Sequence, residues 1–184
     1  IRYSLSATFF EIWREGQLWI EELEVDVRAT YQQLNVQTVL QSLLVLQAEN
    51  LFSWDLSALR AGLKNLRGMT RFLGRWQILG REPLIIADSA HNEGGLKPTL
   101  AQLLEVPFQR LHLVFGTVND KELNKVLPLL PKQAIYYFAK ADVPRGLDAH
   151  SLKAAASEAG LDGEAYASVA EALATAKRAA AKDD

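Results

Sequence analysis

The chain has 184 residues, a net charge of −2 at pH 7, and 49% hydrophobic and 23% charged residues. This composition is typical of a soluble globular protein, and the near-neutral charge gives no generic attraction to nucleic acid or to an anionic membrane. The absence of cysteine excludes disulfides, thiol catalysis and thiolate metal sites, and it suits a cytoplasmic protein. No apolar run approaches the ~20 residues that a membrane-spanning helix needs, and no signal peptide is visible.

The first part of the chain predicts a β-hairpin followed by two helices. Residues Ala7 to Trp13 and Gln17 to Leu23 are rich in aromatic and β-branched side chains, which favour strands. Gly16 lies between them and is free to take the positive φ that a tight turn requires. Helical spacing of apolar residues then predicts helices over about residues 35–47 and 55–66.

Asn35 opens the first of these helices and has two interpretations. Its side chain can cap the helix, or its amide, which both donates and accepts hydrogen bonds, can contact a base such as adenine. The local pattern alone favours the cap. Further along, Gly68 is expected to end the second helix, and residues 69–73 have the character of a linker. We therefore place a domain boundary between residues 73 and 74.

From Gly74 the chain alternates strands and helices, a pattern typical of a parallel sheet with helices on its faces. An edge strand over residues 75–78 is expected to precede the others. Asp120, Asp148 and Ser168 are placed to cap three of the helices. The predicted fold class is α/β, a Rossmann-like and mostly parallel sheet flanked by helices, preceded by an α+β segment. We expect strands over about 84–87, 111–115, 134–138 and 165–168, and helices over about 96–104, 121–130, 149–159 and 169–181.

The segment from Pro83 to Gly95 joins an apolar strand to a helix through a short polar turn. The strand ends in Asp88, so it delivers a carboxylate to its own carboxyl end, which is the edge where ligands bind in open α/β sheets. The alternative is an ordinary turn with a helix cap and no ligand. The local pattern does not decide between the two, because strand–turn–helix units are common.

Several side chains around this turn have the chemistry that a nucleotide requires. Asp88 can accept hydrogen bonds from two ribose hydroxyls, and Arg75 can donate two parallel bonds to a phosphate, although any single arginine can also be a surface cation. His91 follows a strand end, where a histidine is more often structural than catalytic. No metal site is predicted, because neither of the other two histidines forms a close ligand pattern with His91. Lys121 could reach a phosphate or simply be solvated.

One element of a nucleotide site is missing from the sequence. There is no Gly-x-x-x-x-Gly-Lys-Ser/Thr phosphate loop. The chain therefore holds part of an ATP site at most.

Four segments, in one order along the chain, resemble those of the folylpolyglutamate and dihydrofolate synthases of the Mur ligase superfamily. Two departures are Ser89, where the family has Gly, and Glu93, where it has Pro. The matching segments are Tyr31-Gln32-Gln33-Leu34-Asn35, Gly74-Arg75, Asp88-Ser89-Ala90-His91-Asn92 and Val114-Phe115-Gly116-Thr117-Val118-Asn119-Asp120-Lys121-Glu122.

The resemblance implies an ATP-dependent amide ligase that adds L-glutamate to folate or dihydropteroate through an acyl phosphate. The family's matching residues contact ATP, which assigns Asn35, Arg75 and Asp88 to the nucleotide and leaves His91 as the candidate catalytic residue. The phosphate loop and the Mg²⁺ ligands belong to an N-terminal part of the family that this sequence does not contain.

The resemblance also implies a domain organisation. Residues 1–73 would be the end of a central ATPase domain, and residues 74–184 a C-terminal ligase domain that lacks its last strand. Ile1 is not an initiator, so the native product is expected to extend beyond both ends, and the 184-residue chain alone is expected to be inactive.

Two alternatives remain open. One is a cell-wall peptide ligase of the same superfamily, with a different acceptor and a different amino acid. The other is a nucleotide-binding module that does not catalyse. The Tyr31-Gln32 pair and the Asp88 to Asn92 segment favour the folate branch.

Overall fold

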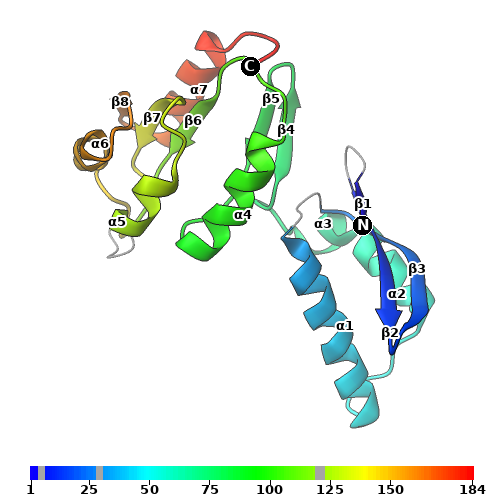
Figure 1. The fold of residues 1–184 in the computed structure, drawn as a ribbon. Helices are drawn as coiled ribbons and strands as arrows, with labels where there is room; N and C mark the ends of the chain where they lie inside the picture. Colours follow the sequence, from blue (N-terminus) through cyan, green and yellow to red (C-terminus); the bar gives the residue numbers. More distant parts are fainter. Residues whose placement is uncertain (4–6, 28–30, 119–122) are drawn as a thin grey trace. The chain divides into compact units, whose positions relative to one another are not determined.

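The computed structural model describes residues 1–3, 7–27, 31–118 and 123–184 (Figure 1). The chain divides into two compact units, one formed by Ile1–Gln77 with Ala87–Ser89 and the other by Ile78–Ile86 with Ala90–Asp184. Within the described ranges, no helix is both long enough and apolar enough to cross a membrane.

The first unit contains a small antiparallel sheet in the order β1-β2-β3. Its strands are β1 (Arg2–Tyr3), β2 (Thr8–Arg14) and β3 (Gln17–Val25). β2 and β3 are joined by Glu15 and Gly16, which have φ angles of 51° and 78°. Two positive φ angles in a two-residue turn match the right-handed twist of the strands they join. The predicted hairpin is confirmed.

Three helices follow in this unit, α1 (Gln32–Ala48), α2 (Leu56–Lys64) and α3 (Leu66–Thr70). The Asp55 side chain caps α2 by accepting from the Ala58 N–H at 2.8 Å. The prediction that Gly68 ends this helix was wrong. α2 already ends at Lys64, and Gly68 lies inside α3, where the chain leaves the helix only at Arg71, which has φ 52°.

The second unit contains a parallel sheet in the order β6-β7-β8. Its strands are β6 (His112–Phe115), β7 (Ile135–Ala139) and β8 (Gly163–Tyr166). Tyr136 stands opposite Gly163, and a Cβ at position 163 would lie 2.2 Å from the Tyr136 carbonyl oxygen. Only glycine allows β8 to approach β7 this closely.

Both faces of this sheet are covered, which is why β7 is apolar at every position. Alternate residues of a strand point to opposite faces, and the helices involved are α4 (Glu93–Leu104), α6 (Ala149–Glu158) and α7 (Val169–Ala179). The predicted α/β architecture is thus confirmed. One core holds Tyr136 and Phe138 with Leu96, Leu100, Leu152 and Ala156, and the other holds Tyr137 and Ala139 with Ala172 and Ala176.

Two helix caps of this unit are those that the sequence predicts, whereas one helix differs from its prediction. Asp148 accepts from the Ser151 N–H at 2.9 Å and Ser168 from the Glu171 N–H at 3.1 Å. The single helix expected over 121–130 is instead α5 (Leu123–Val126) followed by the 3-10 helix η1 (Leu127–Leu129). Pro128 explains the break, because it lacks the N–H that would continue the helix. Asp120 and Lys121 lie outside the described residues.

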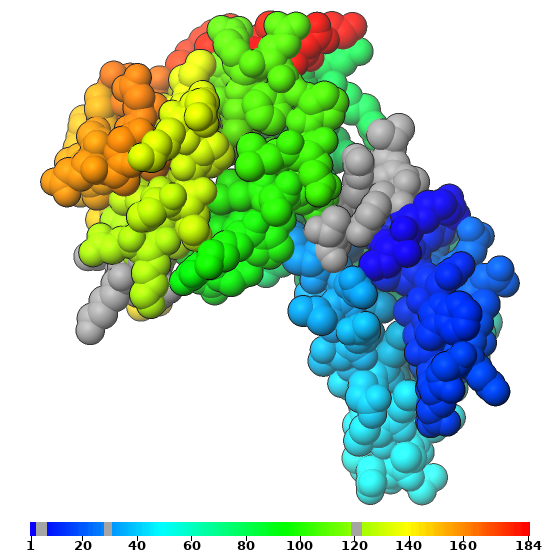
Figure 2. Space-filling model, viewed as in Figure 1, coloured from blue at the N-terminus to red at the C-terminus, as the bar shows by residue number. Residues whose placement is uncertain are grey.

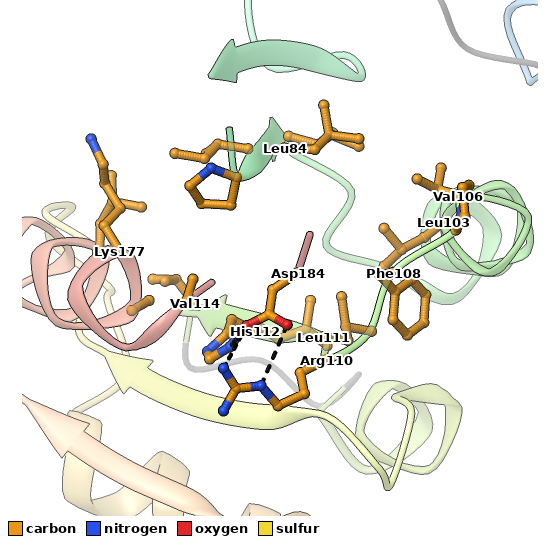
Figure 3. Close-up of a pocket in the computed structure, with 18 residues that line it drawn as sticks. Leu84, Leu103, Val106, Phe108, Arg110, Leu111, His112, Val114, Lys177 and Asp184 are labelled. Carbon is orange, nitrogen blue, oxygen red and sulfur yellow. Dashed lines mark hydrogen bonds and ion pairs between the residues drawn. The ribbon is translucent and has the colours of Figure 1, made fainter. Parts of the chain in front are cut away.

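A second departure concerns the strand that precedes Asp88. β5 (Leu84–Ala87) pairs with β4 (Gln77–Arg81), where the expected edge strand has shifted by two residues, and these two form their own sheet. Among the described strands β5 does not pair with β6, contrary to the expected single sheet. A cavity of about 180 Å³ separates them (Figure 3). It is lined mainly by apolar side chains, including Leu84, Ile86, Leu111, Leu113 and Leu173.

Asp184 is one of the residues that line this cavity (Figure 3). Its carboxylate accepts from the Ala181 N–H at 2.8 Å, the Arg110 guanidinium at 2.8 Å and His112 Nε2 at 3.2 Å. These donors lower the pKa of Asp184 from its ordinary 3.8 to about 2, the Ala181 N–H contributing most and Arg110 next. The Gln109 N–H also donates to the Asp183 carbonyl at 3.0 Å. The red C-terminal residues therefore lie against the light green residues before β6 (Figure 2).

We predict that Asp184 makes the stability of the second unit depend on acid pH. Its folded pKa lies below its ordinary value, so its contribution is present above about pH 4 and is lost as the pH falls toward 2. Asp184→Asn should remove this part of the acid dependence in urea unfolding measured across that range. Asp142→Asn, at an exposed position, is the matched control. An Asp184→Asn variant with the wild-type pH dependence would contradict the assignment.

A second prediction concerns the core of the second unit. Leu152 is fully buried between α6 and β7, so Leu152→Ala should lower the free energy of unfolding by about 2–5 kcal/mol. Leu104→Ala, on the exposed end of α4, should cost much less. Equal losses for the two variants in urea denaturation would show that this core does not hold the unit together.

Candidate functional site

The Asp88 carboxylate lies at the carboxyl end of β5, where the sequence placed it. Its Oδ2 atom accepts two hydrogen bonds, from the Tyr31 hydroxyl at 2.6 Å and from the Trp76 backbone N–H at 2.8 Å. All three residues belong to the first unit. The carboxylate is half-buried, and two donors on one oxygen fix the direction in which it points.

A tight bend in the backbone brings Trp76 to Asp88. Gly74 and Trp76 both have positive φ angles, 69° and 45°, and the Trp76 side chain is only 2% exposed. The Gly74 carbonyl accepts from the Ser89 N–H at 2.8 Å, and a Cβ at Gly74 would lie 3.4 Å from Ser89 Cβ. The positive φ favours glycine at position 74, although a Cβ there would make only an ordinary contact, and burial of the indole holds Trp76 in its left-handed conformation.

The Arg75 side chain contacts Ser89, which is the residue that follows Asp88 in the chain. Its guanidinium donates to the Ser89 Oγ, and it also donates to the Gly74 carbonyl at 3.4 Å. The Arg75 carbonyl accepts from Arg67 at 3.3 Å. Ser89 replaces the glycine of the resembled motif, so the departure from that motif supplies the hydroxyl that Arg75 binds.

Asn35 does not open its helix, and this part of the prediction was wrong. α1 begins at Gln32 after Tyr31, so Asn35 lies in its second turn, beyond the free N–H groups that a cap would satisfy. The Asn35 amide is exposed and donates to Gln32 Oε1 at 2.7 Å. Gln32 is itself buried, and its Nε2 atom has no hydrogen-bond partner among the residues that the structure describes. The role of Asn35 in binding adenine stays a prediction.

His91 belongs to the second unit. It is exposed and lies with Asn92, Gly94, Thr117 and Val118 along an open cavity of about 510 Å³. Asn92 caps α4 by accepting from the Gly95 N–H at 2.9 Å. The cap accounts for Asn92 structurally, whereas the catalytic role of His91 stays a prediction.

Two donors to Asp88 were missed at the sequence level. The Tyr31-Gln32 pair belongs to one of the matching segments, but nothing in the sequence assigns a role to the Tyr31 hydroxyl. The Trp76 N–H could not have been found, because it depends on a backbone conformation that no residue type reports. For a metal ion, the described parts of the chain hold no cluster of three or more His, Asp and Glu side chains.

In the second unit, helices cover both faces of a parallel sheet, which defines an α/β domain. The family model described as "Mur ligase, glutamate ligase domain" matches residues 74–184. The chain therefore belongs to the Mur ligase family.

Its relatives within that family are folylpolyglutamate synthases. A probable bifunctional folylpolyglutamate synthase/dihydropteroate synthase of Haloferax volcanii is 33% identical over 133 residues, which is 71% of this chain and 15% of that protein. The structure of E. coli FolC in complex with DHPP and ADP is 27% identical, with a TM-score of 0.69, over 90% of this chain and 37% of that one.

A third relative is the bifunctional folylpolyglutamate synthase/dihydrofolate synthase of Yersinia pestis, complexed with AMPPNP and Mn ion. It is 26% identical, with a TM-score of 0.56, over 77% of this chain and 33% of that one. The chain thus spans less than two fifths of the length of each of these three relatives.

We predict that Asp88 contributes to stability as well as to any ligand site. Asp88→Ala leaves the buried Trp76 N–H without its acceptor, which should cost about 1–3 kcal/mol. Asp88→Asn keeps an acceptor oxygen and should cost less. Urea denaturation of the two variants beside Asp142→Ala gives the comparison. Equal stability of Asp88→Ala and the wild type would show that the two bonds do not hold this bend.

Proposed function

We propose that this chain is part of an ATP-dependent ligase that joins L-glutamate to folate or dihydropteroate. The observation that carries the proposal is the Asp88 carboxylate, oriented by Tyr31 and Trp76, in a chain of the glutamate ligase family. The names of the relatives add support, since they include ADP, DHPP, AMPPNP and Mn. A cytoplasmic location is part of the proposal.

The side chains of the site fit a nucleoside triphosphate. A carboxylate has about four acceptor positions, so Asp88 can bind ribose hydroxyls while it holds Tyr31 and Trp76. The Arg75 guanidinium, one residue before Trp76, carries the charge and the planar fork that phosphates bind. The exposed Asn35 amide can both donate to and accept from adenine.

The proposed reaction has two steps. The γ-phosphoryl group of ATP passes to a carboxylate of the folate, giving an acyl phosphate and ADP. The amine of L-glutamate then attacks the acyl carbon, so that the C–N bond forms, the bond to phosphate breaks, and the amine gives up a proton. In this scheme Asn35, Arg75 and Asp88 bind and orient ATP. His91 is the candidate for a role near the phosphates or the incoming amino acid.

Mg²⁺ would neutralise charge on the phosphates when it is bound. We assign its ligands, together with the phosphate loop, to a part of the protein outside this sequence. The 184-residue chain is therefore not expected to turn over ATP by itself.

The domain assignment is also a proposal. Residues 1–73 are proposed to end the central ATPase domain and residues 74–184 to form the C-terminal ligase domain. Among the described strands β5 and β6 do not pair, and residues of both line an apolar cavity, which supports a sheet that takes one more strand at that place. A structure of the full-length protein in which β5 pairs directly with β6 would overturn this.

The test is nucleotide binding and turnover by the full-length protein. Asp88→Asn should raise the KM for ATP about 10- to 100-fold, the effect of losing a hydrogen bond to a charged group. The KM for the folate substrate should stay the same, because Asp88 is assigned to ATP alone. Folate-dependent ADP release and glutamate incorporation are the measurements, with Asp142→Asn as the control.

The alternatives give different results in the same assay. A cell-wall peptide ligase would release ADP with a muramoyl acceptor and not with folate. A nucleotide-binding module would bind ATP without turnover with either acceptor. An Asp88→Asn variant with unchanged KM for ATP but lowered stability would leave Asp88 as a structural residue only.

A further inference from the structure

The bond between Tyr31 and Asp88 joins two residues that lie 57 positions apart in the sequence. At 2.6 Å between the two oxygens it is a short bond, as expected when a hydroxyl donates to a carboxylate. Another bond to the same oxygen comes from the backbone of Trp76. Tyr31 is thus a side chain through which the orientation of Asp88 can be altered.

Tyr31 also stands at the start of α1, directly before the first helical residue. Asn35 follows about one helical turn later on the same helix. The hydroxyl therefore ties the end of α1 that carries Asn35 to the turn that carries Asp88. Both turns belong to the first unit, so this tie lies inside one compact body.

We propose that Tyr31 is a positioning residue, which holds Asp88 toward the ribose of ATP and keeps the Asn35 end of α1 in register with it. This inference rests on the proposed function, because it takes Asp88 as the ribose ligand. The Asp88 carboxylate would otherwise rotate about its Cα–Cβ and Cβ–Cγ bonds, and each hydrogen bond made to a ligand would cost that freedom. Two protein donors on Oδ2 set the plane before the nucleotide arrives.

A merely structural role for Tyr31 predicts a different result. Loss of stability alone would weaken the binding of every nucleotide equally. Loss of position should weaken only those contacts that Asp88 makes, which are contacts to ribose hydroxyls. The ratio of affinities for ATP and for its 2′-deoxy and 3′-deoxy analogues separates the two roles.

The experiment measures the Kd of these three nucleotides for the full-length protein and its variants. Tyr31→Phe removes the hydroxyl and keeps the ring. It should weaken the binding of ATP about tenfold, as expected for one bond to a charged group, and weaken the binding of each deoxy analogue by less, because each analogue keeps only one of the two ribose hydroxyls. The KM for folate should not change. Tyr166→Phe, at a half-buried tyrosine stacked on Tyr137 in the second unit, is the control and should keep the wild-type ratio.

The double variant shows whether Tyr31 acts through Asp88. Tyr31→Phe combined with Asp88→Asn should bind ATP no more weakly than Asp88→Asn alone, because residues that share one interaction are not additive. If Asp88→Asn abolishes the preference for ATP and Tyr31→Phe leaves it intact, this inference fails while the proposed function stands. If neither variant changes the preference, the assignment of Asp88 to the ribose fails as well.

Discussion

The hydrogen bonds to the Asp88 carboxylate are the interaction on which the proposed site in the first unit depends. A half-buried charge is tolerated only when donors satisfy it, and here one donor is a side chain far away in sequence and the other is a backbone N–H. Meeting that requirement brings the start of α1, the 74–77 bend and the end of β5 to one place. Trp76 accepts a left-handed backbone conformation in the process, and its buried indole offsets the strain.

The second unit is organised by a different constraint, which is burial on both faces of a short parallel sheet. β7 carries only aromatic and aliphatic side chains, because α4 and α6 cover one face and α7 the other. Charged groups lie at the β6 edge of that sheet. Asp184 accepts hydrogen bonds from Arg110 and His112, and all three residues line the apolar cavity between β5 and β6. The unit therefore combines an apolar core with a cluster of ion pairs at one edge of its sheet.

Two of the side chains proposed to bind the nucleotide are held by the same backbone bend. Arg75 and Asp88 stand on a bend stabilised by glycine at position 74 and by the Ser89 backbone, so neither depends on a flexible loop tip. Ser89 shows how a departure from a motif can be accommodated, since its hydroxyl accepts from Arg75. Sites built on such rigid supports bind with less loss of conformational freedom.

The sequence by itself determined the elements whose cause is local. The β2–β3 turn follows from Gly16, the caps from Asp55, Asp148 and Ser168, and the α/β class from alternating apolar periods. It also predicts that Asp88 and Arg75 bind the same nucleotide. Only the tertiary structure decided that Asn35 lies inside α1, that β5 pairs with β4, and that Tyr31 and Trp76 hold Asp88. These depend on contacts between distant segments and on backbone angles, which residue type and spacing do not encode.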